Sequence, residues 1–202
     1  MCSNPKRSLE VLYKLKKNKF NFKIDYLFFY TEFYKKFIKT CKHTINFNWE
    51  FMSYDLKKNK TSWKFNLSKG GGPLRFYGIH FIAILSKKYK NFENITSVIT
   101  FKKNIPIRWN CKIITSSKKK IEIRINTFAR KNKFTIFSGN KSLYNSLSPF
   151  GNYQKNKKKD YRIKYIDYMI SDLRKNNKYK IYKDSMILWK KIEDKTKFVY
   201  EM

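Results

Sequence analysis

The sequence predicts an α+β fold: a ferredoxin-like core with the split order β-α-β-β-α-β, flanked by extensions. Two observations predict it. Along residues 74–167 the spacing of apolar residues changes repeatedly between the period of a strand and that of a helix. A glycine triplet and a proline at Gly70–Pro73 mark a boundary before this core. We therefore expect an N-terminal extension with a helix and a β-hairpin (1–73), the core (74–167), and a helical C-terminal extension (168–202).

The N-terminal extension contains both periods. Apolar residues at helical spacing predict a helix over about 25–40, which Asp25 could cap: Leu27, Tyr30, Tyr34, Phe37 and Ile38. Strict alternation then predicts two strands, the first with Ile45, Phe47, Trp49 and Phe51, the second with Trp63, Phe65 and Leu67. Because a short polar segment joins them, we interpret residues 45–67 as a hairpin.

The core elements follow one another closely. The pattern predicts strands at 74–85, 111–115, 121–126 and 161–165, and helices at 88–102 and from Ser138 to Pro149. In the C-terminal extension, Met186, Ile187, Trp189 and Ile192 predict a helix around 185–192.

The charge of the chain is strongly unbalanced. Its 202 residues include 47 Lys and Arg but only 14 Asp and Glu, a formal net charge of +33. A coding sequence rich in A and T would raise the lysine content, but it would not deplete the acidic residues. Since 42% of the residues are hydrophobic, the chain can bury enough surface to fold and is not a basic disordered tail. The composition therefore favours a folded body that binds a polyanion.

Other classes of protein receive little support. The three cysteines are too few and too scattered for a disulfide framework, and no apolar run reaches the ~18 residues that span a bilayer. Cys41 and His43 give only two of the four ligands that a structural zinc site needs. His80 lies within an apolar run, so we interpret it as a packed or surface histidine of a strand rather than a catalytic base. Catalytic motifs are absent and acidic residues are scarce, so we expect no enzyme activity, no metal and no cofactor.

Basic clusters are the strongest candidate binding feature. Loops that project from a rigid sheet can place several cations on successive phosphates. Arg108 also precedes Trp109, which pairs a forked donor with a stacking surface, both suited to RNA. We expect the RNA-binding residues to be Arg108, Lys118, Lys119, Lys120, Arg124, Arg130, Lys131, Lys133, Lys155, Lys157, Lys158 and Lys159.

Part of the core resembles a known family. Ile105-Pro106-Ile107 precedes one strand, Lys118–Lys120 lie in the following loop, and Ile121-Glu122-Ile123-Arg124 begins the return strand. In these features residues 74–166 resemble the small-subunit ribosomal protein S-ten family, although the family's Ser-Pro-His-Val segment is absent. The Lys-rich folded body as a whole is similar to organelle-encoded mitochondrial ribosomal proteins.

This resemblance implies a structural role in translation. The expected partners are ribosomal RNA and neighbouring ribosomal proteins, without a membrane span or a small-molecule substrate, and the expected location is the mitochondrial matrix. Two alternatives stay open. An accessory subunit of a respiratory complex should show a spanning or strongly amphipathic helix, and an RNA-processing enzyme should show a cluster of acidic residues that holds Mg²⁺.

Overall fold

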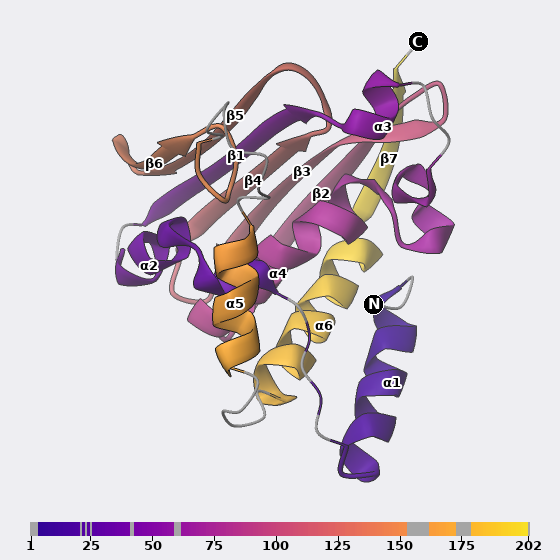
Figure 1. Ribbon diagram of the computed structural model, residues 1–202, viewed down its shortest axis with the longest axis vertical. Coiled ribbons are helices and arrows are strands. Elements are labelled where there is room, and N and C mark those ends of the chain that lie inside the picture. The colour runs from indigo at the N-terminus through magenta and orange to yellow at the C-terminus, as the bar shows by residue number, and fades with distance from the viewer. Residues whose placement is uncertain are drawn as a thin grey trace.

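A mixed sheet of seven strands organises the chain in its computed structural model (Figure 1). The structure describes residues 4–20, 22, 24, 26–40, 43–58, 62–152, 162–172 and 179–201. The strands are β1 (Thr44–Met52), β2 (Phe92–Lys102), β3 (Ile105–Thr115), β4 (Lys120–Asn126), β5 (Phe128–Ser138), β6 (Lys141–Ser146) and β7 (Thr196–Glu201). Their order in the sheet is β6-β5-β1-β4-β3-β2-β7. β1 runs parallel to β4, and β7 runs parallel to β2, while the other neighbours are antiparallel.

The two faces of the sheet differ in polarity. On β1, Phe47 and Trp49 are buried, while the intervening Asn48 is half-buried on the opposite face. The register pairs Phe47 with Ile123 and Trp49 with Ile125, so the buried face continues onto β4. Because successive side chains of a strand point to opposite faces, this alternation gives one apolar face and one polar face.

Helices cover the apolar face (Figure 1). Phe81 packs against Phe47 at a ring-centroid distance of 5.3 Å, and Phe37 lies at the same distance from Phe47. α6 packs against both α4 and α1. The α-helices are α1 (Pro5–Lys17), α2 (Glu32–Lys39), α3 (Tyr54–Lys57), α4 (Ile79–Lys88), α5 (Ile163–Ser171) and α6 (Tyr179–Asp194). Short 3₁₀ turns are η1 (Leu27–Tyr30), η2 (Trp63–Phe65) and η3 (Leu67–Lys69), and η4 (Pro73–Gly78) is a π-helical turn that leads directly into α4.

The prediction of a ferredoxin-like core is wrong. The segment expected as a strand at 74–85 forms η4 and α4, and the segment expected as a helix at 88–102 contains β2. In α4 nearly every side chain is buried, so the run is apolar on all sides and shows no helical period. In β2 the apolar residues happen to recur at helical spacing because Ser97 and Thr100 are polar but buried.

For the remaining elements, some predictions are wrong and others are confirmed. The predicted hairpin is wrong: β1 pairs with β4 and β5, and its expected partner strand forms η2 and η3. The segment after Ser138 contains β6 instead of a helix, and the strand expected at 161–165 overlaps α5. The strands at 111–115 and 121–126 and the helix at 185–192 are confirmed within β3, β4 and α6. The helix expected at 25–40 corresponds to η1 and α2, while Asp25 lies outside the described residues.

The sheet draws strands from well-separated parts of the chain. β1 precedes the glycine triplet and β7 lies near the C-terminal end of the chain, yet they lie in the same sheet as β2 to β6. The division at residues 73 and 167 stays a prediction. Among the described residues, no helix is both long and apolar enough to cross a membrane.

Candidate functional site

A cavity of about 850 Å³ lies where the C-terminal end of β1 meets α1, η1, η4 and α4. Aromatic side chains dominate its wall: Phe28, Trp49, Phe51, Phe76, Tyr77 and Phe150. In open α/β sheets, ligands characteristically bind beyond the carboxyl ends of parallel strands. β1 is such a strand, because it runs parallel to β4.

The aromatic wall is a packed unit. Trp49 and Phe51 on β1 lie 4.8 Å apart between ring centroids, and the edge of Tyr77 meets both rings at 5.3 and 4.9 Å. Such tilted and edge-to-face pairs are favourable beyond the area that they bury. The wall therefore presents a firm apolar surface to whatever occupies the cavity.

The π-helical turn η4 presents side chains to this cavity. π-Helical turns are rare and often occur at functional sites. Phe76 and Tyr77 of this turn line the cavity, as does His80 in the first turn of α4. Gly78 allows the turn to lie directly on β3, because a Cβ atom there would be only 2.5 Å from the ring of Trp109.

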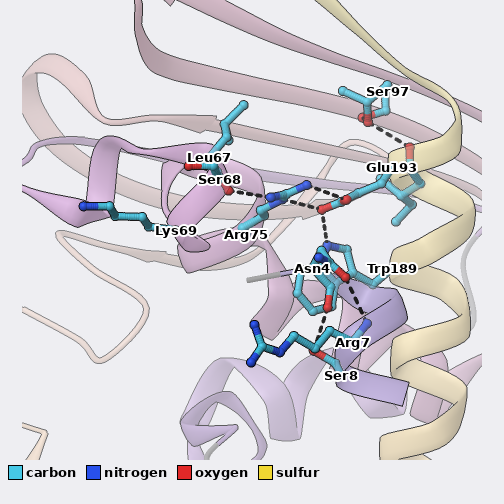
Figure 2. Close-up of polar contacts among 12 residues, drawn as sticks. Asn4, Arg7, Ser8, Leu67, Ser68, Lys69, Arg75, Ser97, Trp189 and Glu193 are labelled. Carbon is cyan, nitrogen blue, oxygen red and sulfur yellow. Dashed lines mark hydrogen bonds and ion pairs between the residues drawn. The ribbon is translucent and has the colours of Figure 1, made fainter. Parts of the chain in front are cut away.

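Arg75 anchors the same turn from its other side (Figure 2). Its guanidinium forms an ion pair with Glu193 of α6 and donates a hydrogen bond to the carbonyl oxygen of Leu67. The turn is thereby fastened to both the C-terminal helix and the preceding segment.

His80 is an unusual residue in this wall. Its ring lies 4.9 Å from the ring of Phe28 and meets Tyr26 edge-on at 6.2 Å. Nδ1 is buried and has no hydrogen-bond partner within the described part of the chain. Burial lowers the pKa of His80 to about 4, since the charged form would lose its hydration. The imidazole is therefore neutral at pH 7.

Polar groups gather at one side of the cavity. Burial raises the pKa of Tyr77 to about 12, although a hydrogen bond with Ser53 opposes the shift, so the phenol stays protonated. Asp55 Oδ2 lies 3.3 Å from Lys64 Nζ, and both of these residues line the cavity. The site thus combines a mainly apolar wall with two neutral hydrogen-bonding groups and an ion pair.

Those of the expected RNA-binding residues that the structure describes do not line this cavity. Several form ion pairs on the protein itself: Arg108 with Glu201, Lys118 Nζ with Glu93 at 2.9 Å, and Arg124 with Glu122 at 2.9 Å. Lys119 lies in the turn between β3 and β4, and Lys120 is the first residue of β4. Arg130, Lys131 and Lys133 are exposed on β5. Lys155, Lys157, Lys158 and Lys159 lie outside the described residues. No finding tests their contact with RNA, which stays a prediction.

Metal ligands do not gather anywhere in the described segments, where no group of three His, Cys, Asp or Glu side chains could hold an ion. Cys2 and Cys41 lie outside those segments. Cys111 is a buried free thiol on β3, and burial raises its pKa, which makes it unreactive as a nucleophile.

The sequence interpretation missed the importance of His80. It placed this residue in a strand, where neighbouring side chains point to opposite faces. In a helical conformation, Phe76 and Tyr77 lie four and three positions before His80, on the same side of the helix as this residue. That spacing is the signal that could have revealed the site.

No family model matches the sequence, and no curated protein matches it either. Solved structures do match the fold. KijD10, a 3-ketoreductase from Actinomadura kijaniata in complex with NADP and TDP-benzene, has a TM-score of 0.67 and 8% identity. The match covers 99% of this chain and 70% of that one. The WlbA dehydrogenase from Chromobacterium violaceum, in complex with NADH and UDP-GlcNAcA, has a TM-score of 0.69 and 13% identity, with 96% and 66% covered. An NAD binding oxidoreductase from Klebsiella pneumoniae has a TM-score of 0.65 and 9% identity, with 96% and 68% covered.

The chain shares the fold of these oxidoreductases. At such low identity the likeness concerns the fold, and the chain spans about two thirds of the length of these proteins. It nevertheless overturns the ribosomal interpretation. The resemblance to the S-ten family and to mitochondrial ribosomal proteins is wrong, and so is the assignment to a small ribosomal subunit and to translation.

The expected absence of activity and of a small-molecule substrate is also wrong. The similar structures are enzymes, and the complexes named above hold NADP, NADH, TDP-benzene or UDP-GlcNAcA. The prediction of ribosomal RNA and ribosomal proteins as partners is contradicted by the same similar structures, which hold small molecules.

A dinucleotide would need a phosphate cradle, and the glycine triplet of this chain does not fit one. The usual cradle is a Gly-x-Gly-x-x-Gly turn between a strand and a helix, with open space above the glycines. Here a Cβ atom at Gly71 would lie 2.3 Å from the carbonyl oxygen of Trp63, and one at Gly72 would lie 2.7 Å from Leu67. The chain itself fills the space that phosphates would occupy. The glycine triplet therefore allows neighbouring segments of the chain to pack closely, and it does not form a dinucleotide-binding turn.

Proposed function

We propose that this chain is the substrate-binding part of an oxidoreductase, and that the cavity beside β1 binds a small organic molecule. The observation that carries the proposal is the aromatic cavity with the neutral side chains of His80 and Tyr77 in its wall. Ligand sites are typically concave, about 300–1,000 Å³ in volume and mostly apolar, with a few well-placed polar groups. The cavity beside β1 has these properties.

The fold supports the same class of function. Oxidoreductases of similar architecture have been solved with TDP-benzene or UDP-GlcNAcA bound. Those ligands belong to those proteins, and for this chain they favour a ring-containing organic substrate. The location in the mitochondrial matrix stays a prediction.

The residues of the cavity would act on the substrate by binding and by orientation. The wall formed by Trp49, Phe51 and Tyr77 would exclude water from one side of the substrate. His80 and Tyr77 would hold a polar atom of the substrate through neutral hydrogen bonds. Since the glycine triplet does not fit a dinucleotide, we assign no step of the reaction to NAD(P) on this chain.

A thermal-shift experiment tests the proposal. The purified chain is heated with 2-naphthol, indole, UDP-GlcNAc or NADPH, each over a range of concentrations. A ligand at 100 times its Kd stabilises the folded state by about 2.7 kcal/mol, which corresponds to a rise in Tm of roughly 5–10 °C for a chain of this size. We expect such a rise with at least one of the ring compounds other than NADPH.

A matched pair of variants locates the binding site. Val11 of α1 lines the cavity and is 40% exposed, whereas Tyr13 on the same helix is 49% exposed and lies outside it. Val11→Trp should fill part of the cavity and weaken binding, while Tyr13→Trp should not. Binding of NADPH alone, no binding of any ring compound, or equal effects of the two variants would overturn the proposal.

A further inference from the structure

We infer that the ligand of this cavity is an uncharged ring compound with one hydroxyl or carbonyl oxygen, and that this oxygen hydrogen-bonds to Nε2 of His80. This inference rests on the proposed function, because it names the class of molecule that the cavity would accept. It is carried by the position of His80 and by the chemistry of the surrounding wall.

The two ring nitrogens of His80 have different surroundings. Nδ1 is enclosed and has no hydrogen-bond partner among the described residues. The residue as a whole is nevertheless only half-buried, and it forms part of the cavity wall. Nε2 is therefore the nitrogen through which the ring can meet a ligand. No hydrogen bond to Nε2 is formed among the described residues either, so a ligand oxygen at Nε2 would give the imidazole its missing hydrogen-bond partner.

The wall of the cavity selects against charge. Phe28 and Tyr26 flank His80, and within the described segments no carboxylate shifts the pKa of its ring. Asp55 and Lys64 compensate each other at 3.3 Å. Arg162 is the other charged residue among the described lining. A ligand ion that lay between the aromatic rings of the cavity would lose its hydration there, which is unfavourable. An uncharged ring would instead gain from contact with the aromatic side chains.

The required polar atom can be either hydroxyl or carbonyl. A neutral imidazole donates from one nitrogen and accepts at the other, so Nε2 can pair with either kind of oxygen, according to its tautomer. Tyr77 lies three residues before His80 and also lines the cavity, and its protonated phenol is a second neutral donor in this wall. The cavity wall therefore offers two neutral hydrogen-bonding groups, one on η4 and one on α4.

Four matched probes test this inference. 2-Naphthol carries a hydroxyl, 2-tetralone a carbonyl, naphthalene no oxygen, and 2-naphthoate a negative charge at pH 7. Their Kd values are measured with the wild-type chain by quenching of tryptophan fluorescence. We expect 2-naphthol and 2-tetralone to bind about tenfold more tightly than naphthalene, which is the effect of one well-placed neutral hydrogen bond. We expect 2-naphthoate to bind more weakly than 2-naphthol.

Substitution of His80 assigns the preference to its ring. In His80→Phe the preference for 2-naphthol over naphthalene should disappear, while naphthalene itself still binds and thereby reports an intact cavity. His80→Gln, whose amide can donate and accept, should restore part of the preference. Lys90→Met, an exposed change outside the cavity, should leave all four Kd values unchanged.

The outcomes separate this inference from the proposed function. Equal binding of naphthalene and 2-naphthol by the wild type, tighter binding of 2-naphthoate, or an unchanged preference in both His80 variants would overturn the inference while leaving a functional cavity. If none of the four probes binds and the thermal-shift panel is also negative, both the inference and the proposed function fail.

Discussion

Arg75 and Glu193, which are 118 residues apart in the sequence, form a two-pronged ion pair between η4 and α6 (Figure 2). Arg75 Nε lies 2.7 Å from Glu193 Oε1, and Nη2 lies 2.8 Å from Oε2. Trp189 Nε1 donates a further hydrogen bond to Oε1 at 2.7 Å. The side chains are only 20% and 16% exposed, so water screens this pair weakly. The pair ties the turn that carries Tyr77 to the C-terminal helix.

Glu193→Gln removes the charge of this pair but preserves the shape of the side chain. Because it leaves a half-buried guanidinium without its counter-charge, we expect the free energy of unfolding to fall by about 2 kcal/mol, as measured by urea denaturation. Asp194→Asn is the control, since Asp194 pairs with Lys190 at an exposed position, and its cost should stay below about 0.5 kcal/mol. Equal costs for the two variants would show that the Arg75 pair has no special role.

Gly78→Ala should destabilise the fold by about 2 kcal/mol, although alanine is a good helix former. The new methyl group would meet the ring of Trp109, which is fully buried and fixed by a hydrogen bond from Nε1 to Ser97 Oγ at 2.9 Å. Gly139→Ala is the matched control. Its Cβ would meet open space, so only the positive φ of 59° opposes the change, at about 1 kcal/mol. Thermal denaturation of both variants measures the difference, and a larger loss at Gly139 would contradict the packing argument.

His80 makes stability depend on pH. Its pKa is about 4 in the folded protein, below the ordinary value of 6.5, so the unfolded chain binds the proton more readily. The stabilisation is fully present above pH 6.5 and is lost as the pH falls from 6.5 towards 4, by at most about 1.4 kcal/mol per pH unit. Urea denaturation at pH 7 and pH 5 should therefore show a larger loss in the wild type than in His80→Phe. A parallel loss in both proteins would indicate that His80 is readily protonated in the folded state.

Lys88 stabilises the end of α2. Its ammonium group donates to the carbonyl oxygens of Phe37 at 2.6 Å, Ile38 at 3.3 Å and Thr40 at 2.5 Å, and it lies over the ring of Phe37. Carbonyl groups at a helix C-terminus otherwise lack partners within the helix. Lys88→Met should cost about 1–2 kcal/mol and increase amide hydrogen exchange in α2. Lys90→Met, at an exposed position, should change neither quantity.

Sequence pattern predicted the elements whose burial alternates regularly. β4 alternates buried isoleucines with more exposed polar residues, and α6 buries Met186, Trp189 and Ile192 along one side. These are the patterns that a half-buried strand and a half-buried helix impose. The sequence pattern predicted the wrong element where a segment is buried on all sides. The apolar run of α4 is enclosed by the sheet, η1 and α6, so its sequence has no period that distinguishes helix from strand.

The candidate site depended still less on local pattern. Phe28, Trp49, Tyr77 and Phe150 come from four separate parts of the chain. Contacts between distant segments bring them together, among them the parallel pairing of β1 with β4 and the packing of η4 on β3. The high net charge described the surface rather than the fold. Lys131 and Lys133 are exposed on β5, and Lys112 and Arg124 are 72% and 59% exposed, where charge does not determine topology.

The most direct measurement uses the two histidines of the chain, His43 and His80. With ¹⁵N-labelled histidine, NMR resolves the ring nitrogens of both residues while 2-naphthol is titrated into the wild-type protein. His43 is exposed and does not line the cavity, so it reports non-specific effects. We expect the ¹⁵N resonances of the His80 ring to shift with a saturable dependence on 2-naphthol, while those of His43 do not shift. Unchanged His80 signals at saturating 2-naphthol, or equal shifts at both histidines, would contradict it.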